Sequence, residues 1–380
     1  MTRVQVRPEL LRWARERSER GVHALATRFP RLAAWEAGEA SPTLKQLEAF
    51  ARATHVPIGF LFLAEPPREP VPIPDLRTIA SEPLGRPSPD LLDAIYLCQR
   101  RQAWYRDWAR SVGEEPRRFV GSASIGSSPE RVAATMREAL GFDLESRRAC
   151  PTWTEALRQF AAQADDLGVL VMVSGVVGSN NRRKLDPDEF RGFALADELA
   201  PLVFVNGSDT KAAQMFTLAH ELAHLWLGES ALSDAGPASA PSDRVETWCN
   251  RVAAELLVPI DVLRQEVAAR VPLPDAQELA RRFKVSTLVI LRRLLDLGRL
   301  TRQEFEDAYE LELERFRSLP RTSGGDFYLT QPIRLSRRFA RALVVSTLEG
   351  QTLHRDAFRM LGISKPETFQ QLSERVLTPA

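Results

Sequence analysis

The sequence predicts a mainly helical protein with one small β-sheet, an α+β fold divided into several domains. Three observations support this prediction. The chain has 380 residues, which is longer than one compact core usually accommodates. Of these residues 44% are hydrophobic and 27% charged, a composition typical of a folded protein. Apolar residues recur at helical spacing through most of the sequence. Between about residues 169 and 205 this pattern gives way to short apolar runs separated by turn-forming residues, which predicts strands.

The same patterns predict where the domains divide. Residues 65–74 contain five prolines, which favour an extended linker because proline cannot sit inside a helix. Strands are expected at residues 169–173, 190–196 and 202–205, and one more at 327–330. The expected domains are a helical domain at 1–65, a proline-rich linker at 66–80, a helical connecting region at 81–150, the sheet-containing domain at 151–265, a helical segment at 266–302 and a helical C-terminal region at 303–380.

Charge and cysteine content limit the classes of function. The 51 basic and 50 acidic side chains leave a net charge of +1, so the whole chain is not attracted to nucleic acid or to a membrane surface. The three cysteines form no Cys-x-x-Cys pair, which favours a reducing compartment. No apolar run is long enough to span a bilayer, and the N-terminus is too charged for a signal peptide. We therefore expect a cytoplasmic protein without a membrane partner.

One segment has the pattern of a metal-binding helix. From Ala212 to Gly228 nearly every residue is apolar, and the polar residues share one stripe of the predicted helix. The His-Glu-x-x-His spacing places His220 and His224 one turn apart, where both can bind one zinc ion, and Glu221 can act as a general base. With 5 histidines in the chain, this pattern is expected by chance roughly 0.005 times. The alternative is a pair of core histidines with ordinary hydrogen-bond partners.

A catalytic zinc site normally has a third protein ligand. The next predicted helix, residues 242–258, places Glu246 and Asn250 one turn apart on one face, with Glu255 on the opposite side. Glu246 is the candidate ligand, and Asn250 is expected to hold its carboxylate. The spacing from Asp243 to Glu246 is also that of a capping box, in which the glutamate reaches a backbone amide. The remaining alternative ligands are Asp234, Asp243 and Cys249.

These segments resemble the zinc metallopeptidase domain of the ImmA/IrrE family. The resemblance covers about residues 160–265 and rests on four segments: Arg191–Asp197, Pro201–Asn206, Phe216–His224 and Glu246–Pro259. It implies a zincin-like fold, Zn²⁺ bound by His220, His224 and Glu246, and Glu221 as the general base. Family members cut repressors of the helix-turn-helix type during prophage induction or DNA-damage responses. The resemblance also implies that strands near the motif present an edge to which an extended substrate can pair.

The N-terminal segment Leu25–Thr43 resembles the helix-turn-helix of phage repressors (XRE type), through Trp35-Glu36 and Gly38. Proteins that join this module to an ImmA/IrrE peptidase form a recognisable subfamily. The segment is about four residues shorter than in the repressors, which removes the turn and the base-reading start of the second helix. Two interpretations stay open, a domain that reads DNA and a scaffold that docks a partner protein.

A second helix-turn-helix spacing occurs at Leu279–Leu294. Between Ala276 and Arg302 there are seven basic and two acidic residues, a charge pattern that suits phosphate contacts. The alternative is a three-helix packing unit with a solvated basic face, because ImmA/IrrE proteins carry a similar helical segment after the peptidase. The candidate nucleic-acid contacts are Arg281, Arg282, Lys284, Arg292 and Arg293.

Together these features predict a zinc-dependent endopeptidase that regulates transcription by cutting or controlling a repressor-like or toxin-like partner protein. The circuit would be of the stress, prophage or toxin-antitoxin type, and DNA is a further expected partner. The alternative is a DNA-binding regulator or antitoxin-like protein whose zinc site is structural or vestigial. A site closed by a fourth protein ligand would favour that alternative, because catalytic zinc sites keep one position open.

Overall fold

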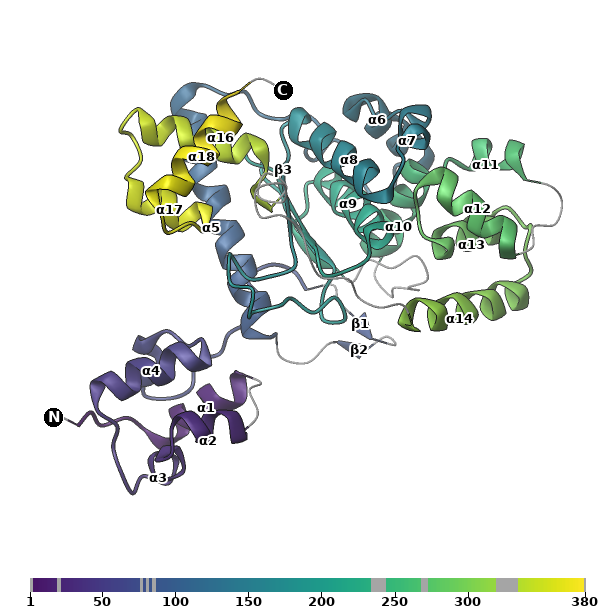
Figure 1. Cartoon of the computed structure of the whole chain (residues 1–380). Coiled ribbons are helices and arrows are strands. Elements are labelled where there is room, and N and C mark those ends of the chain that lie inside the picture. The colour runs from purple at the N-terminus through teal and green to yellow at the C-terminus, as the bar shows by residue number, and fades with distance from the viewer. Residues whose placement is uncertain are drawn as a thin grey trace. The chain divides into compact units, whose positions relative to one another are not determined.

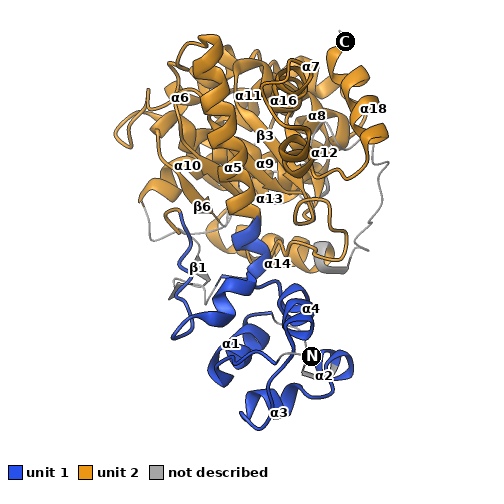
Figure 2. Ribbon diagram, turned by 90° about the vertical axis from the view of Figure 1, so that its left-hand side faces the viewer, with its two compact units in different colours: residues 1–72, 85–93 blue, residues 73–84, 94–380 orange. Residues whose placement is uncertain are grey.

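The computed structural model describes residues 3–18, 22–75, 78–79, 82–83, 87–233, 244–267, 273–318 and 334–378. The chain forms two compact units (Figure 2). The first comprises residues 1–72 and 85–93, and the second comprises residues 73–84 and 94–380. The strand expected at residues 327–330 and the candidate residues Asp234 and Asp243 lie outside the described residues.

The first unit is a small helical bundle with its own core. Leu10, Phe50 and Leu61 are fully buried in it, and Phe29 and Trp35 pack beside them. The helix that opens after Thr43 has a capping box, in which Thr43 and Gln46 bond each other's backbone amides. The elements of this unit are α1 (Pro8–Arg17), α2 (Val22–Arg28), α3 (Leu32–Glu36), α4 (Leu44–Thr54) and the 3₁₀ helix η1 (Ile58–Phe62).

The second unit is built around a four-stranded mixed sheet with the strand order β3-β5-β4-β6. β3 and β5 are parallel, whereas β4 is antiparallel to both of its neighbours, β5 and β6. These strands span Leu170–Ser174 (β3), Gly192–Leu195 (β4), Leu202–Asn206 (β5) and Ala231–Ser233 (β6). A separate two-stranded ribbon pairs β1 (Thr78–Ile79) with β2 (Glu82–Pro83). The prediction of a mainly helical protein with one small sheet is therefore confirmed.

The sheet is buried on both faces, which explains why its strands read as continuous apolar runs. Alternate residues such as Val171, Val203 and Ala194 join the largest core cluster together with residues of α8, α9 and α10. On the opposite face, Met172 of β3 contacts Cys98 of α5. Helix α9 (Lys211–Leu227) packs on β4 and β5, and α8 (Trp153–Leu167) packs on β3 (Figure 1). Helices α6 (Pro129–Leu140) and α10 (Arg244–Leu257) pack against these two helices and each other, and α7 (Leu144–Ala149) follows α6. Helix α5 spans Pro89–Val112.

Helices also make up the rest of the second unit. Asp165, near the end of α8, connects α8 to the start of α16. Its carboxylate accepts hydrogen bonds from the Ser336 hydroxyl and, at 2.8 Å, from the Arg338 amide. These helices are α11 (Ile260–Glu266), α12 (Leu273–Phe283), α13 (Thr287–Asp296), α14 (Arg302–Ser318), α16 (Arg337–Leu348), α17 (His354–Leu361) and α18 (Pro366–Leu377).

The outer strand β6 is itself covered at one point by the proline-rich linker. The Leu232 amide donates a hydrogen bond to the Pro74 carbonyl at 2.9 Å, and Asp75 forms a parallel bridge with Leu232. The sequence predicts neither β6 nor this pairing. The linker therefore contributes to the sheet instead of only joining two domains.

No helix within the described ranges has the length and apolar character that a membrane crossing requires. The three cysteines are free thiols, with Cys98 and Cys249 buried and Cys150 partly exposed.

Candidate metal centre

The His-Glu-x-x-His motif lies on α9, the central helix of the second unit. The helix begins after Thr210, whose hydroxyl accepts a hydrogen bond from the Ala213 amide, and it ends at Gly228 in the left-handed conformation. Every residue from Gln214 to Trp226 is buried. The polar stripe of this helix is therefore held inside the protein.

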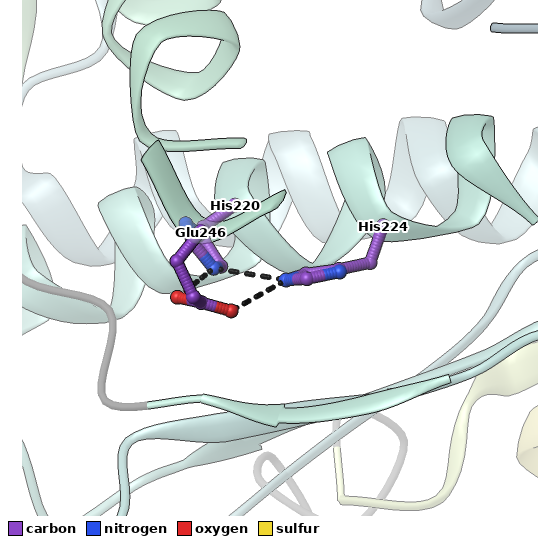
Figure 3. A group of neighbouring side chains, drawn as sticks. All are labelled: His220, His224 and Glu246. Carbon is purple, nitrogen blue, oxygen red and sulfur yellow. Dashed lines mark hydrogen bonds and ion pairs between the residues drawn. The ribbon is translucent and has the colours of Figure 1, made fainter. Parts of the chain in front are cut away.

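Three side chains converge at one point of this buried seam (Figure 3). The Nε2 atoms of His220 and His224 lie 3.1 Å apart. Glu246 points one carboxylate oxygen at each ring, at 3.2 Å from His220 Nε2 and 3.1 Å from His224 Nε2. All three side chains are buried. The sequence prediction that these residues come together is thus matched by the geometry of the described structure.

Helix α10 places Glu246 opposite the motif because it packs along α9. Trp248, Cys249, Val252 and Ala253 bury the apolar face of α10 in the main core. Cys249 is buried but does not belong to the group of converging ligand atoms. The capping-box alternative cannot be followed at Asp243, which lies outside the described residues.

Glu255 points away from this site, as its spacing from Glu246 predicts. Its carboxylate forms a buried ion pair with Arg293 of α13 and accepts the Ile260 amide at 3.3 Å. It therefore supports the packing of α10 against α13 and is not a ligand.

Asn250 follows Glu246 by one turn and lies beside His220, whose pKa it helps to raise. The Asn250 Oδ1 and the His220 Nδ1 are both buried, and neither has a hydrogen-bond partner within the described ranges. Asn250 is thus adjacent to a histidine ring, whereas the sequence analysis expected it to hold the Glu246 carboxylate.

Two residues from the sheet complete the site, and sequence reasoning missed both. The Ser233 hydroxyl on β6 donates to Glu246 Oε1 at 3.3 Å and lies 3.4 Å from His224 Nε2. Gly192 on β4 faces Glu221, because a Cβ at this position would lie 3.0 Å from Glu221 Oε1. A glycine within a strand often marks such a close approach, and this glycine was the one sequence signal that could have pointed to β4 as part of the site. Ser233 had none, because β6 has only three residues.

Burial and mutual charge set the protonation of these groups. Burial alone would raise the pKa of Glu246, but the two histidines outweigh it and hold that pKa well below its usual value. Burial lowers the pKa of His220, and the charge and hydrogen bond of Glu246 reverse this, so the pKa is raised. The pKa of His224 is lowered by burial and by the neighbouring His220. The cluster therefore favours an ionised Glu246 between two imidazoles.

Glu221 follows His220 directly on α9 but does not belong to the group of converging ligand atoms. Both of its carboxylate oxygens are buried and lack hydrogen-bond partners among the described residues. Burial is the main reason why its pKa rises to about 8. A carboxylate buried without partners is costly, and a nearby divalent cation would favour its ionised form.

The geometry and chemistry of the donors fit a zinc ion. Ligand atoms 2.0–2.1 Å from a tetrahedral zinc ion are separated by roughly 3.3–3.4 Å. The two Nε2 atoms lie 3.1 Å apart here, and each ring has its own Glu246 oxygen nearby, Oε2 at 3.2 Å from His220 and Oε1 at 3.1 Å from His224. Two imidazole nitrogens and one carboxylate form a ligand set that zinc enzymes use. Within the described ranges the cluster offers three protein donors. This number leaves a tetrahedral ion one open position.

The predicted basic patch of α12 and α13 is only partly exposed. The prediction that Arg293 belongs to an exposed basic patch is wrong, because this residue is 7% exposed and pairs with Glu255. Arg292 pairs with Asp296 at 3.2 Å, and Arg282 with Glu266 at 3.4 Å. Lys284 lies over the Trp153 ring, and Arg281 is exposed.

Helix α13, which corresponds to the second helix of the proposed helix-turn-helix, is itself largely buried. Thr287 to Leu291 are buried without interruption, and Arg293 and Leu294 follow. A recognition helix needs an exposed face to enter the major groove. Helix α13 therefore offers little exposed surface for such a contact.

The N-terminal helix-turn-helix signature also has structural roles. Trp35 is buried in the core of the first unit, Glu36 pairs with Arg15 at 2.8 Å, and Gly38 adopts a left-handed turn. Helix α3 has five residues, and Glu36 is its one polar residue. These residues stabilise the bundle and leave α3 without a free base-reading side chain.

Two segments of the chain match known domain families. Residues 164–295 match the IrrE N-terminal-like domain, and residues 335–375 match a domain of unknown function, DUF8813. No match was found among curated proteins. The first match includes α9, α10 and the converging side chains, and it continues through α13. The chain therefore carries an IrrE N-terminal-like metallopeptidase domain at residues 164–295, with a buried cluster of His220, His224 and Glu246.

Proposed function

We propose that this protein is a zinc-dependent endopeptidase in which His220, His224 and Glu246 bind the metal. The observation that carries the proposal is the convergence of these three side chains beside Glu221, whose buried carboxylate oxygens have no hydrogen-bond partner among the described residues. Bound zinc would supply Lewis-acid polarisation of the scissile carbonyl and would lower the pKa of a water molecule.

The residues of the chain divide the remaining work. Glu221 accepts a proton from the attacking water molecule and delivers it to the leaving amine, as a general base and then a general acid. Ser233 orients the Glu246 carboxylate through its hydrogen bond. Gly192 leaves room for the Glu221 side chain against β4. The buried helices around the site exclude bulk water, which strengthens the interactions of these charges.

The substrate proposed for this activity is a repressor-like or toxin-like protein of a stress, prophage or toxin-antitoxin circuit. Its support is the resemblance to ImmA/IrrE peptidases, which cut repressors of this kind. Cleavage of such a protein would link the peptidase to control of transcription.

The non-catalytic alternative, a DNA-binding regulator with a structural zinc ion, has weaker support. A structural site is usually closed by a fourth ligand, and the described residues provide three. Helix α13 is buried, which leaves its segment little surface for DNA.

The test compares Glu221→Gln with the wild-type protein. The variant should bind one equivalent of zinc, because the three ligands are intact, and should fail to cut a repressor-like protein that the wild-type protein cuts. Glu229→Gln is the matched control, because Glu229 is exposed just after the same helix. Zinc is measured by elemental analysis, and cleavage by the appearance of defined fragments. Full cleavage by Glu221→Gln would contradict the proposed general base.

A further inference from the structure

A small pocket lies away from the metal centre, where α5, the segment after β3 and the residues before α16 meet. Its lining includes Arg101 of α5, Ser174 and Ser179, Arg334 and Leu361. The pocket thus joins the IrrE N-terminal-like domain to the segment that matches the domain of unknown function.

Arg101 is a buried cation without a matching carboxylate. It is 5% exposed. Its Nε donates to the Met360 carbonyl at 3.0 Å, and its Nη1 lies 3.5 Å from the Met172 sulfur, a weak acceptor. Within the described ranges no carboxylate lies within ion-pair distance of it. Burial lowers its pKa to about 10, which shows how poorly its charge is compensated.

Arg334 brings a second positive charge to the same pocket. Its side chain is partly buried, and burial lowers its pKa. Within the described part of the chain it makes no hydrogen bond or ion pair. The described lining residues include no aspartate or glutamate. Two arginines, from positions more than two hundred residues apart in the sequence, therefore line one cavity to which no described lining residue brings a carboxylate.

One simpler role for Arg101 explains only part of this arrangement. Met360 is the penultimate residue of α17, so Arg101 stabilises the negative end of that helix. This contact uses one of the five N–H groups of the guanidinium. It does not explain why Arg334 faces the same pocket.

We propose that this pocket binds a small oxyanion, a phosphate, sulfate or carboxylate group. Guanidinium groups bind such anions through paired, charge-assisted hydrogen bonds. The cavity measures about 20 Å³, and because one water molecule needs roughly 10–15 Å³, its size suits one small group and not a whole nucleotide. A bound anion would link α5 to the C-terminal helices and stabilise their association with the peptidase domain.

The test measures binding to the full chain by calorimetry and by thermal unfolding. Sodium phosphate, sulfate and acetate are titrated separately, with ionic strength held constant by sodium chloride. We expect at least one of the three to bind and to raise Tm. A response to phosphate and sulfate alone identifies a tetrahedral anion, and a response to acetate identifies a carboxylate. No response to any of them would overturn the proposal.

Variants place the binding in this pocket. Arg334→Gln should weaken binding about 10–100-fold, since it removes charged hydrogen bonds, whereas Arg334→Lys should weaken it less. Arg341→Gln is the matched control, because Arg341 is exposed on α16, and it should bind like the wild type. If Arg334→Gln binds the anion as tightly as the wild type, the anion does not bind in this pocket, and the proposal is refuted. An anion held at the metal centre would give this result. If Arg334→Gln does not fold, wild-type affinity in Arg334→Lys refutes it equally.

Discussion

Replacing Gly192 by alanine tests how closely β4 and the motif helix approach each other. The new Cβ would lie 2.6 Å from Thr217 Cγ2, 2.8 Å from the Phe204 carbonyl oxygen and 3.0 Å from Glu221 Oε1. The Phe204 oxygen belongs to the paired strand β5, so it cannot rotate away as a side chain can. Overpacking of this kind costs about 1–3 kcal/mol of unfolding free energy, or roughly 2–10 °C in Tm.

The same substitution should separate zinc binding from cleavage. The added methyl group would lie against Glu221, and its three nearest neighbours include none of the three proposed ligands, so Gly192→Ala should bind zinc and cleave poorly. Adding Thr217→Ser removes the closest contact but leaves the Phe204 oxygen, so the double variant should regain only part of the lost stability. Gly126→Ala is the control, because its nearest neighbour lies 3.8 Å away. Wild-type stability and cleavage in Gly192→Ala would refute this account of the site.

Three further predictions concern charged groups. Glu246→Gln should lower zinc affinity by more than the roughly 10–100-fold typical of residues that only orient a ligand, and a chelator competition that shows equal affinity would rule out Glu246 as a ligand. Arg293→Met should destabilise the protein by about 3–5 kcal/mol because it leaves Glu255 buried and unpaired. Adding Glu255→Leu to Arg293→Met should restore much of the lost unfolding free energy, measured by urea unfolding. A double variant as unstable as Arg293→Met would contradict the pairing. Burial raises the pKa of Asp165 to about 6, although the Ser336 hydroxyl and Arg338 act in the opposite direction. The folded state therefore holds this proton more tightly than the unfolded state does. As the pH rises from about 4 to 6, the wild type should lose about 3 kcal/mol of stability that Asp165→Asn does not lose. Urea unfolding across this range measures the difference, and parallel curves for the two proteins would contradict it.

The metal centre could be predicted because its main signals are local in sequence. His220 and His224 lie one helical turn apart on α9. Polar residues are unexpected on a helix that is otherwise apolar on all sides, so they indicate a function. Glu246 required a second helix, but the spacing within that helix was enough to select it over Glu255. Helical and strand periodicity likewise predicted β3, β4 and β5 to within about two residues, which is the usual uncertainty of element ends.

Features that depend on contacts between distant segments could not be predicted. The sequence shows that Arg293 is basic but not that Glu255, from another helix, lies beside it in the core. The same holds for Arg101 and Arg334, which meet only in the folded chain. Ser233 enters the site from a strand too short for a periodic pattern. Charge along a sequence thus indicates a nucleic-acid surface only when the charged side chains remain exposed.

The pairing of the proline-rich linker with β6 introduces competition beside the metal centre. A backbone amide in a strand makes one such hydrogen bond, and the Leu232 amide already donates to Pro74. Leu232 immediately precedes Ser233, which contacts Glu246. An extended polypeptide that paired with this edge would first have to displace residues 74–75. Because Pro74 has no N–H of its own, it donates no hydrogen bond in return, so the linker competes for this amide through the Pro74 carbonyl.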